Sequence, residues 1–247
     1  MNIGIIYEDK DLLVLDKPAG ITVNKSDTTI HEETVQDWIE ARIIDLGFRI
    51  SEFDKDSDFY KRAGIAHRID KETSGILLVA KNKESFEALQ AQFKDRKVKK
   101  TYIALVHGKV EPGEGEIRVP VGRLPWNRKR FGVLAGGKEA VTRYKVIETR
   151  YKFSGKDKES LSLLELNPET GRTHQIRVHL KYINHPIFAD FLYAGRKTSR
   201  DDRKDLERVF LHAGGISFYH PKTGEQISFE SRLPEELKNF WESLDSI

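Results

Sequence analysis

The chain has 247 residues, of which 42 are Lys or Arg and 39 are Asp or Glu. Its length suits one large domain or two small ones with a buried core, and 13 Phe, 8 Tyr and 3 Trp make it too apolar for disorder. The absence of Cys excludes disulfides, thiolate nucleophiles and thiolate zinc sites. No apolar run approaches the roughly 18 residues of a membrane span, and the N-terminus lacks the basic region of a signal peptide. We therefore expect a soluble, cytoplasmic protein without a membrane partner.

The net charge of +3 conceals an asymmetry along the chain. Residues 1–60 carry a net charge of −8, whereas residues 61–247 carry +11. Such asymmetry is a hint of contact with nucleic acid. The alternative is that the lysines only decorate a solvated surface.

The first part of the chain predicts three strands and two helices. Short strands are expected at 3–7 and 12–16. The 3.6-residue apolar period over 35–46 predicts a helix that Thr34 caps and Gly47 ends. Residues 51–61 read as an exposed loop and 75–80 as a buried strand. Phe86, Leu89 and Phe93 give the next helix its apolar face.

The remaining chain predicts six strands and two helices. Strands are expected at 101–107, 115–120, 140–148 and 160–167. Thr173 is placed as the cap of a short helix that Asn184 ends. Strands at 209–218 and 226–229 then lead to a last helix from Pro234. We expect one α+β domain over 1–247, with a mostly antiparallel sheet.

Residues 66–75 place an imidazole, two cations, two carboxylates and two hydroxyls directly ahead of a buried strand. Loops held by a rigid scaffold often carry catalytic groups. Asp70 lies between Arg68 and Lys71, whose charges favour an ionised carboxylate. The alternative is a strand-entry turn in which Asp70 only accepts backbone hydrogen bonds.

Residues 169–180 form a second dense segment. A helix starting at Thr173 would offer free N–H groups and a positive dipole end, which Arg172 and Arg177 reinforce as an anion site. Arg177 is also able to bind a carboxylate through two hydrogen bonds. Alternatively, Arg172 is an exposed cation and Arg177 belongs to a structural ion pair.

Other site chemistries find little support. Six of the eight histidines are candidate metal ligands, but no two of them have H-x-x-x-H or H-E-x-x-H spacing. No G-x-S-x-G, Walker or G-x-G-x-x-G motif occurs. We therefore expect neither a metal nor a cofactor.

Two basic tracts favour RNA. Lys94, Arg96, Lys97, Lys99 and Lys100 precede Tyr102, and residues 123–130 interleave cations with Trp126. Cations that pair with phosphates, beside aromatic rings, suit RNA, whose unpaired bases stack on such rings. Either tract alone is also consistent with a solvated face.

Several segments resemble motifs of the RluA-type pseudouridine synthases. Residues 67–82, HRIDKETSGILLVAKN, resemble the pattern H-R-L-D-x-x-T-S-G-x-L-L-x-A-K. Residues 16–20 (DKPAG), 100–108 (KTYIALVHG), 170–180 with 185–187, and 211–213 with 220–221 resemble its other motifs in order. Departures are Ile69 for Leu, Ala189-Asp190 for Gly-Asp, and Tyr193-Ala194-Gly195 for Tyr-Gly. No room for an S4-type RNA-binding domain precedes Ile3, so we expect the catalytic domain itself to select the RNA.

The resemblance implies isomerisation of uridine to pseudouridine in RNA. It implies a sheet with flanking helices and a central active-site cleft. By resemblance, Asp70 is the essential carboxylate, Arg177 pairs with it, and Tyr102 stacks on the flipped uracil and assists the final proton removal. Arg68 would fill the stack that the flipped base vacates, and His67 would support the loop.

We further expect RNA contacts from the residues that surround these motifs and from the basic tracts. The predicted RNA-binding and base-flipping set is His67, Arg68, Arg172, Lys97, Lys99, Lys100, Arg128 and Arg130. The expected partner is a stem-loop of ribosomal or transfer RNA, and the expected state is a monomer. Alternatives are an RNA-binding module without activity, and a hydrolase that uses Asp70 and Glu72 as paired carboxylates.

Overall fold

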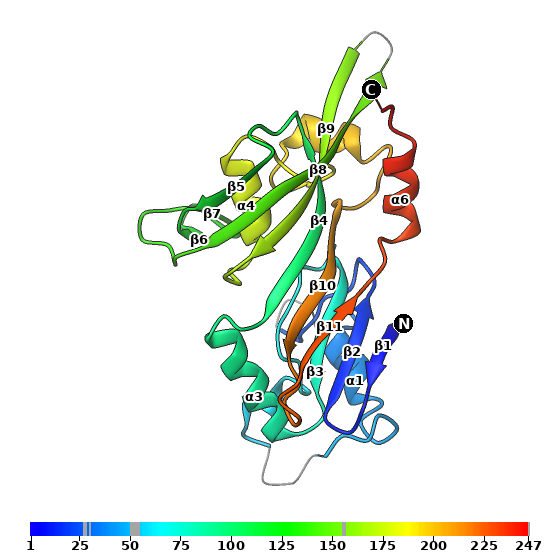
Figure 1. The fold of residues 1–247 in the computed structure, drawn as a ribbon, viewed down its shortest axis with the longest axis vertical. Helices are drawn as coiled ribbons and strands as arrows, with labels where there is room; N and C mark the ends of the chain where they lie inside the picture. The colour runs from blue at the N-terminus through cyan, green and yellow to red at the C-terminus, as the bar shows by residue number, and fades with distance from the viewer. Residues whose placement is uncertain (27–28, 30, 50–54, 155–156, 247) are drawn as a thin grey trace. The chain divides into compact units, whose positions relative to one another are not determined.

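The computed structural model describes residues 1–26, 29, 31–49, 55–154 and 157–246. The chain forms two compact units (Figure 1). Unit 1 comprises Met1–Lys99 and Ala213–Arg232, and unit 2 comprises Lys100–His212 and Leu233–Ile247. None of the described helices is long and apolar enough to cross a membrane. The single domain expected over 1–247 stays a prediction.

Unit 1 is built on a sheet in the order β1–β2–β3–β10, and β11 pairs with β10. The strands are β1 (Gly4–Glu8), β2 (Leu12–Lys17), β3 (Ser74–Ala80), β10 (Leu211–Tyr219) and β11 (Gln226–Glu230). The β1–β2, β2–β3 and β10–β11 ladders are antiparallel. Every residue of β3 is buried, as expected for the short apolar run over 75–80.

The helices of unit 1 differ in part from the expectation. Helix α1 (Val35–Glu40) begins at Thr34, which forms a capping box with Asp37. It is shorter than the predicted helix, because the chain turns after it through tighter bonds such as Arg42 N–H to Ile39 O. Helix α3 (Lys83–Lys94) buries Phe86 and Leu89, as predicted.

The expected loop over 51–61 is wrong at its end. Residues 50–54 lie outside the described chain, but Asp58–Lys61 form the short helix α2. Ser57 caps this helix by accepting a hydrogen bond from Tyr60 N, and Phe59 is buried. The polar composition around Phe59 conceals a single buried anchor, which periodicity does not detect.

Unit 2 holds the remaining ladder, in the order β10–β4–β9–β8–β5. Its strands are β4 (Lys99–His107), β5 (Glu114–Arg118), β8 (Val141–Ser154) and β9 (Asp157–Pro168). The β4–β9, β8–β9 and β5–β8 pairs are antiparallel. A separate antiparallel hairpin of β6 (Val121–Leu124) and β7 (Asn127–Val133) contains the second basic tract and was not expected from the sequence.

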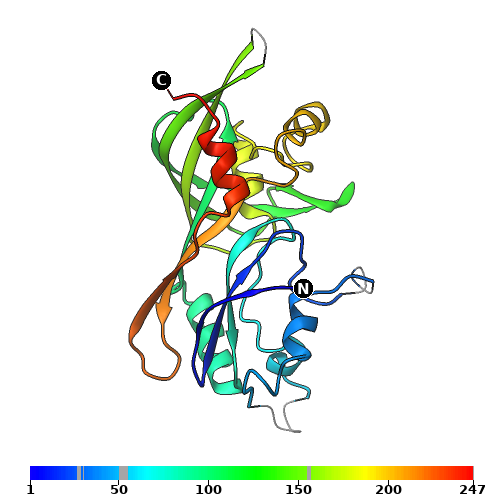
Figure 2. The same ribbon diagram turned by 90° about the vertical axis from the view of Figure 1, so that its right-hand side faces the viewer.

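Three helices complete unit 2. They are α4 (Gln175–Tyr182), α5 (Arg196–Asp202), which the sequence did not predict, and α6 (Glu235–Glu242). Helix α6 lies beside β8 (Figure 2). The Arg150 guanidinium carbon of β8 lies 4.4 Å from the centroid of the Trp241 ring. The predicted cap of α4 is wrong: His174, with φ 56°, occupies that position and makes no side-chain cap bond. The α+β class and the mostly antiparallel sheet are confirmed.

Candidate active site

In unit 1, the loop that carries Asp70 is held by hydrogen bonds to the residue after it, Lys71. Asp70 is half-buried, and the fully buried Lys17 Nζ donates to the carbonyl of the next residue, Lys71, at 3.1 Å. The same ammonium donates to the carbonyls of Pro18 and Ile21, and Gly20 N–H donates to Lys71 O at 2.8 Å. Residues 16–20 therefore act as a brace for the Asp70 loop.

His67 fastens the start of the same loop. Its Nε2 accepts a hydrogen bond from Leu78 N–H of β3 at 3.0 Å, so this nitrogen carries no proton. The ring also lies 5.0 Å from the Phe93 ring of α3. Arg68, next in the chain, is exposed.

Gly75, the second residue of β3, lies where no side chain fits. Its φ is 111°, and a Cβ there would lie 2.2 Å from Ala213 O of β10. Only glycine fits both the conformation and the approach of the two backbones. The glycine of the motif is thus explained by the close approach of β3 and β10.

In unit 2, Arg177 of α4 is buried and binds the carboxylate of Asp190, a residue that had no predicted role. Its Nε and Nη2 donate to Asp190 Oδ2 and Oδ1 at 2.7 and 2.8 Å. Asp190 Oδ1 also accepts hydrogen bonds from Leu192 N–H and Tyr193 N–H. This bidentate pair fixes the plane of the Arg177 guanidinium.

Two guanidinium groups contact the ring of Tyr193. The guanidinium carbons of Arg177 and Arg130 lie 5.0 and 5.3 Å from the ring centroid. The Tyr193 hydroxyl accepts a hydrogen bond from Phe131 N–H at 3.1 Å and lies 2.9 Å from His174 Nδ1. Two of the predicted residues, Arg177 and Arg130, are therefore brought together through a residue that had no assigned role.

The C-terminal end of α5 holds the peptide just before Asp190. Asp202 Oδ2 accepts from Ala189 N–H at 3.0 Å, and Arg203 Nε donates to Ala189 O at 3.1 Å. Ala189 has φ 60°, a left-handed conformation that costs a non-glycine residue energy. These two bonds support that conformation and, through it, the position of Asp190.

His107 of β4 joins this arrangement from the sheet. Its Nε2 lies 3.1 Å from Asp202 Oδ2, and its Nδ1 lies 2.6 Å from Glu159 Oε1. Burial alone lowers the pKa of His107, but the hydrogen bonds to Asp202 and Glu159 outweigh it and raise the pKa to about 9. The same bond holds the pKa of Glu159 below its ordinary value. His107 is thus a cation between two carboxylates at neutral pH.

Lys100 and Tyr102 lie two residues apart on β4, so their side chains leave the same face of the strand. Lys100 Nζ donates to Thr170 O at 3.3 Å. Burial lowers the pKa of Lys100 to about 8. Tyr102 is half-buried and packs against the apolar core of unit 2.

The loop just before α4, where the sequence predicts an anion site at Thr173, has hydrogen bonds of its own. Gln175 Oε1 accepts from Arg172 N–H at 3.0 Å and from the Thr170 hydroxyl, so a side chain already uses the loop donors. Arg172 Nε donates to Glu139 O at 3.0 Å. These bonds use the Arg172 N–H and the Thr170 hydroxyl, and the anion site expected at the start of this helix stays a prediction.

The remaining predicted residues lie on exposed surface. Lys97 lies 3.6 Å from Asp95, and Lys99 and Arg128 are exposed. Asp70, His67, Arg68, Lys97 and Lys99 belong to unit 1, whereas Tyr102, Arg177, Lys100, Arg172, Arg128 and Arg130 belong to unit 2. The pairing of Asp70 with Arg177 stays a prediction.

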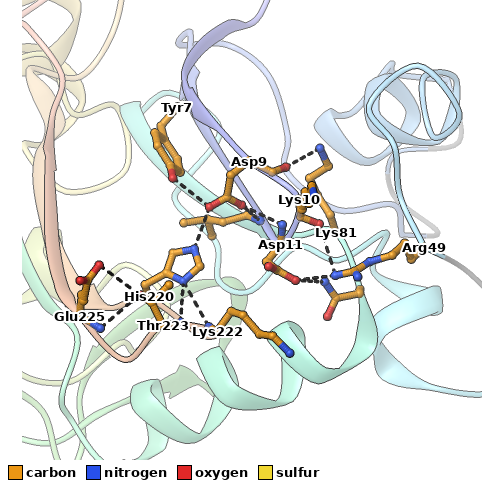
Figure 3. A network of polar contacts seen from close by, with 12 residues as sticks. Tyr7, Asp9, Lys10, Asp11, Arg49, Lys81, His220, Lys222, Thr223 and Glu225 are labelled. Carbon is orange, nitrogen blue, oxygen red and sulfur yellow. Dashed lines mark hydrogen bonds and ion pairs between the residues drawn. The ribbon is translucent and has the colours of Figure 1, made fainter.

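The histidines weighed as ligands make structural contacts. No group of three metal-ligating side chains occurs among the described residues. His220 Nε2 lies 2.8 Å from Asp9 Oδ2, and its Nδ1 accepts from Lys222 and Thr223 N–H (Figure 3). Tyr7 donates to the same Asp9 carboxylate. This network joins the β1–β2 turn to the β10–β11 turn.

Comparison with known proteins identifies the family. Residues 11–182, which include both Asp70 and Arg177, match the family model described as RNA pseudouridylate synthase. The chain belongs to this family. It is therefore an isomerase that acts on RNA.

Relatives and solved structures agree with that assignment. The chain is 39% identical over 244 residues to the RNA pseudouridine synthase YlyB of Bacillus subtilis, covering 99% of this chain and 73% of that one. It is 38% identical to the ribosomal large subunit pseudouridine synthase D of Neisseria meningitidis, covering 96% of this chain and 60% of the relative. The human RNA pseudouridylate synthase domain containing 1 superposes with a TM-score of 0.69 at 26% identity, covering 94% of this chain and 83% of that one.

Proposed function

We propose that this pseudouridine synthase converts uridine to pseudouridine in ribosomal or transfer RNA, with Asp70 as its essential carboxylate. The C1′–N1 bond breaks, the uracil turns in place, and a C1′–C5 bond forms. N1 gains a proton and C5 loses one, so the reaction needs no redox partner or group donor. The relative named for the ribosomal large subunit supports ribosomal RNA as the first substrate to test.

Asp70 is the residue that we assign to the reacting nucleoside. The observation that carries this assignment is the fastening of its loop on both sides, by His67 to Leu78 N–H and by Lys17 to Lys71 O. These two bonds hold the main chain of the loop on either side of Asp70. A catalytic group gains from such a rigid support because little ordering remains to be done when substrate binds.

Tyr102, Arg177 and Arg68 receive supporting roles. We assign Tyr102 to the face of the flipped uracil and to the final proton removal, and Arg177 to orientation of the Asp70 carboxylate. Exposed Arg68 is assigned to the vacated base stack, where a flat guanidinium stacks better than an ammonium. Lys97, Lys99, Lys100, Arg172, Arg128 and Arg130 are assigned to RNA phosphates. We further propose a monomer that works in the cytoplasm, where ribosomal and transfer RNA are found.

Pseudouridine mapping of total RNA from cells with and without the gene tests the proposal. The expected result is one or a few uridines that lose modification when the gene is deleted and regain it with the wild-type gene. Restoration by a gene carrying Asp70→Asn would contradict the role of Asp70. An unchanged map in the deleted strain would contradict the ribosomal and transfer RNA assignment.

A further inference from the structure

The β6–β7 hairpin presents a tryptophan to solvent at its tip. Trp126 is 76% exposed, whereas the chain's other two tryptophans, Trp38 and Trp241, are 6% and 8% exposed. Leu124 pairs with Asn127, so Pro125 and Trp126 form the turn itself. Proline fixes its own backbone angle and stiffens the turn. An exposed aromatic side chain is unremarkable alone, so its surroundings decide what it does.

Those surroundings are cationic without compensation. Residues 121–133 contain four Lys or Arg and no Asp or Glu. Among the described side chains of this hairpin, Arg123 donates to Arg128 O at 2.8 Å, and neither Arg123, Arg128 nor Arg130 pairs with a described carboxylate. Elsewhere in unit 2 the exposed arginines of β5 and β8, Arg118 and Arg143, both pair with Glu116. The positive charge of the hairpin is thus not neutralised by carboxylates, whereas that of Arg118 and Arg143 is.

The root of the hairpin is firmly held. Phe131 N–H donates to the Tyr193 hydroxyl at 3.1 Å, and Val121 exchanges two backbone hydrogen bonds with Lys138. Arg123 lies 5.0 Å from the Phe131 ring centroid, and Arg130 lies against Tyr193, the residue that also contacts Arg177. A fixed root and a stiff tip make a preorganised surface, which lowers the entropic cost of binding. Figure 1 shows the hairpin at one edge of unit 2.

We propose that the β6–β7 hairpin binds an unpaired stretch of the substrate RNA, with the indole of Trp126 stacked on one base and Arg128 on the adjoining phosphates. Unpaired bases expose the faces that stack on aromatic rings, whereas the bases of a duplex already stack on each other. Uncompensated arginines beside an exposed ring match this ligand in both charge and shape. The inference rests on the proposed function only in taking RNA as the substrate, and it adds a substrate feature: a single-stranded segment that the hairpin binds.

The fluorescence of the protein offers a direct test, because Trp126 is its one exposed tryptophan. The probes are a synthetic RNA stem-loop with uridines in its loop and a fully paired duplex of the same composition, titrated against the Asp70→Asn protein. We expect quenching by the stem-loop and little by the duplex. In the Trp126→Phe protein the quenching should vanish while most binding remains, because phenylalanine keeps a ring.

Binding measured by filter retention completes the test. Trp126→Ala should raise the Kd for the stem-loop by about 5- to 150-fold, the range that base–aromatic stacking supports. The matched control is Ile44→Ala, which removes another exposed apolar side chain, 90% exposed, from unit 1. Equal losses for both variants, an unchanged Kd for Trp126→Ala, or equal loss for duplex and stem-loop would each overturn the proposal. Quenching that follows protein concentration without RNA would also overturn it, by assigning Trp126 to a contact between copies.

The proposed function fails separately. If the stem-loop binds and quenches Trp126 but the wild-type protein leaves the pseudouridine map unchanged, the hairpin proposal stands and the reaction assignment falls. If modification occurs in cells but Trp126→Ala binds RNA like the wild type, the reverse holds.

Discussion

The Arg177–Asp190 pair is the most tightly constrained ionic contact of the site. Both side chains are buried, and two parallel hydrogen bonds join them. Removing one partner of a buried ion pair typically costs about 3–5 kcal/mol. The pair therefore serves Arg177 more by fixing its position than by adding net stability.

A double-mutant cycle tests this reading. Asp190→Ala should lower the free energy of unfolding by about 3–5 kcal/mol, because Arg177 stays buried without its carboxylate. The double variant Asp190→Ala/Arg177→Ala should lose much less than the sum of the single losses. Urea denaturation measures all three proteins. Strictly additive losses would show that the two side chains act independently.

Lys100 gives a prediction about pH. Burial lowers its pKa to about 8, so the ammonium loses its proton as pH rises through that value. If Lys100 binds phosphate, RNA affinity should fall by about fivefold between pH 7 and 9, equivalent to about 1 kcal/mol. The Lys100→Arg protein should bind equally across this range, since arginine stays charged. If the RNA affinities of the two proteins change with pH in the same way, Lys100 does not bind RNA phosphate.

At the residue scale, the sequence predicted more of the chemistry than of its supports. Asp70, Tyr102 and Arg177 stand within recognisable motifs, and the brace of Lys17 on Lys71 accounts for one such motif in physical terms. Asp190 and Tyr193 were visible only as the neighbours of two departures from the family pattern, and the sequence assigned no role to either. Their contacts depend on the left-handed backbone at Ala189, which no local propensity predicts.

At the scale of elements, α5 explains how Asp190 is held. Its end supplies Asp202 and Arg203 to the two polar groups of Ala189, and Asp202 in turn pairs with His107 of β4. A seven-residue helix without a capping side chain therefore links a strand of the sheet to the loop that orients Arg177.

This link should make stability depend on pH. The folded-state pKa of His107 is raised to about 9, above the unfolded value of 6.5. Its contribution is therefore complete below pH 6.5 and is lost as pH rises through 9. The wild type should lose on the order of 2 kcal/mol of unfolding free energy across this window relative to His107→Gln. Guanidinium denaturation at pH 6 and pH 9.5 measures the difference, and equal losses in both proteins would contradict a charged His107.

The elements themselves were predicted unevenly. Apolar strands such as β3 and the amphipathic α3 were predicted because burial alone specifies them. The sequence missed α2, α5 and the β6–β7 hairpin, which are short, highly charged and held by single anchors such as Phe59 or by distant contacts such as Tyr193. The local pattern of apolar and polar residues does not predict such contacts.

For the whole molecule, the charge asymmetry agrees with an enzyme that acts on RNA. The net charge of +11 lies in residues 61–247, which hold Asp70, the basic tracts and the β6–β7 hairpin. The α+β class and the antiparallel order were predicted from the succession of strands. The division into two compact units was not, because no linker marks it in the sequence.

The basic tract before β4 gives a prediction about salt. Replacing Lys97 and Lys99 with Gln should reduce the slope of log affinity against log salt by roughly 1.4–1.8, because two fewer counterions are released on binding. Lys109→Gln is the control, since Lys109 is an exposed lysine outside the basic tract and outside the predicted RNA contacts. Titrations of the RNA stem-loop at several salt concentrations measure the slopes. An unchanged slope in the double variant would show that these lysines only form a solvated surface and do not contact RNA.

The central claim is that Asp70 drives uridine isomerisation in RNA, and tritium release tests it most directly. Replacement of the C5 hydrogen by the new C1′–C5 bond frees tritium from RNA made with 5-tritiated uridine. The purified wild-type protein should release tritium from ribosomal RNA taken from a strain without the gene, and Asp70→Asn should release it at least roughly 10³-fold more slowly while still binding RNA. Comparable release by the two proteins would contradict the account.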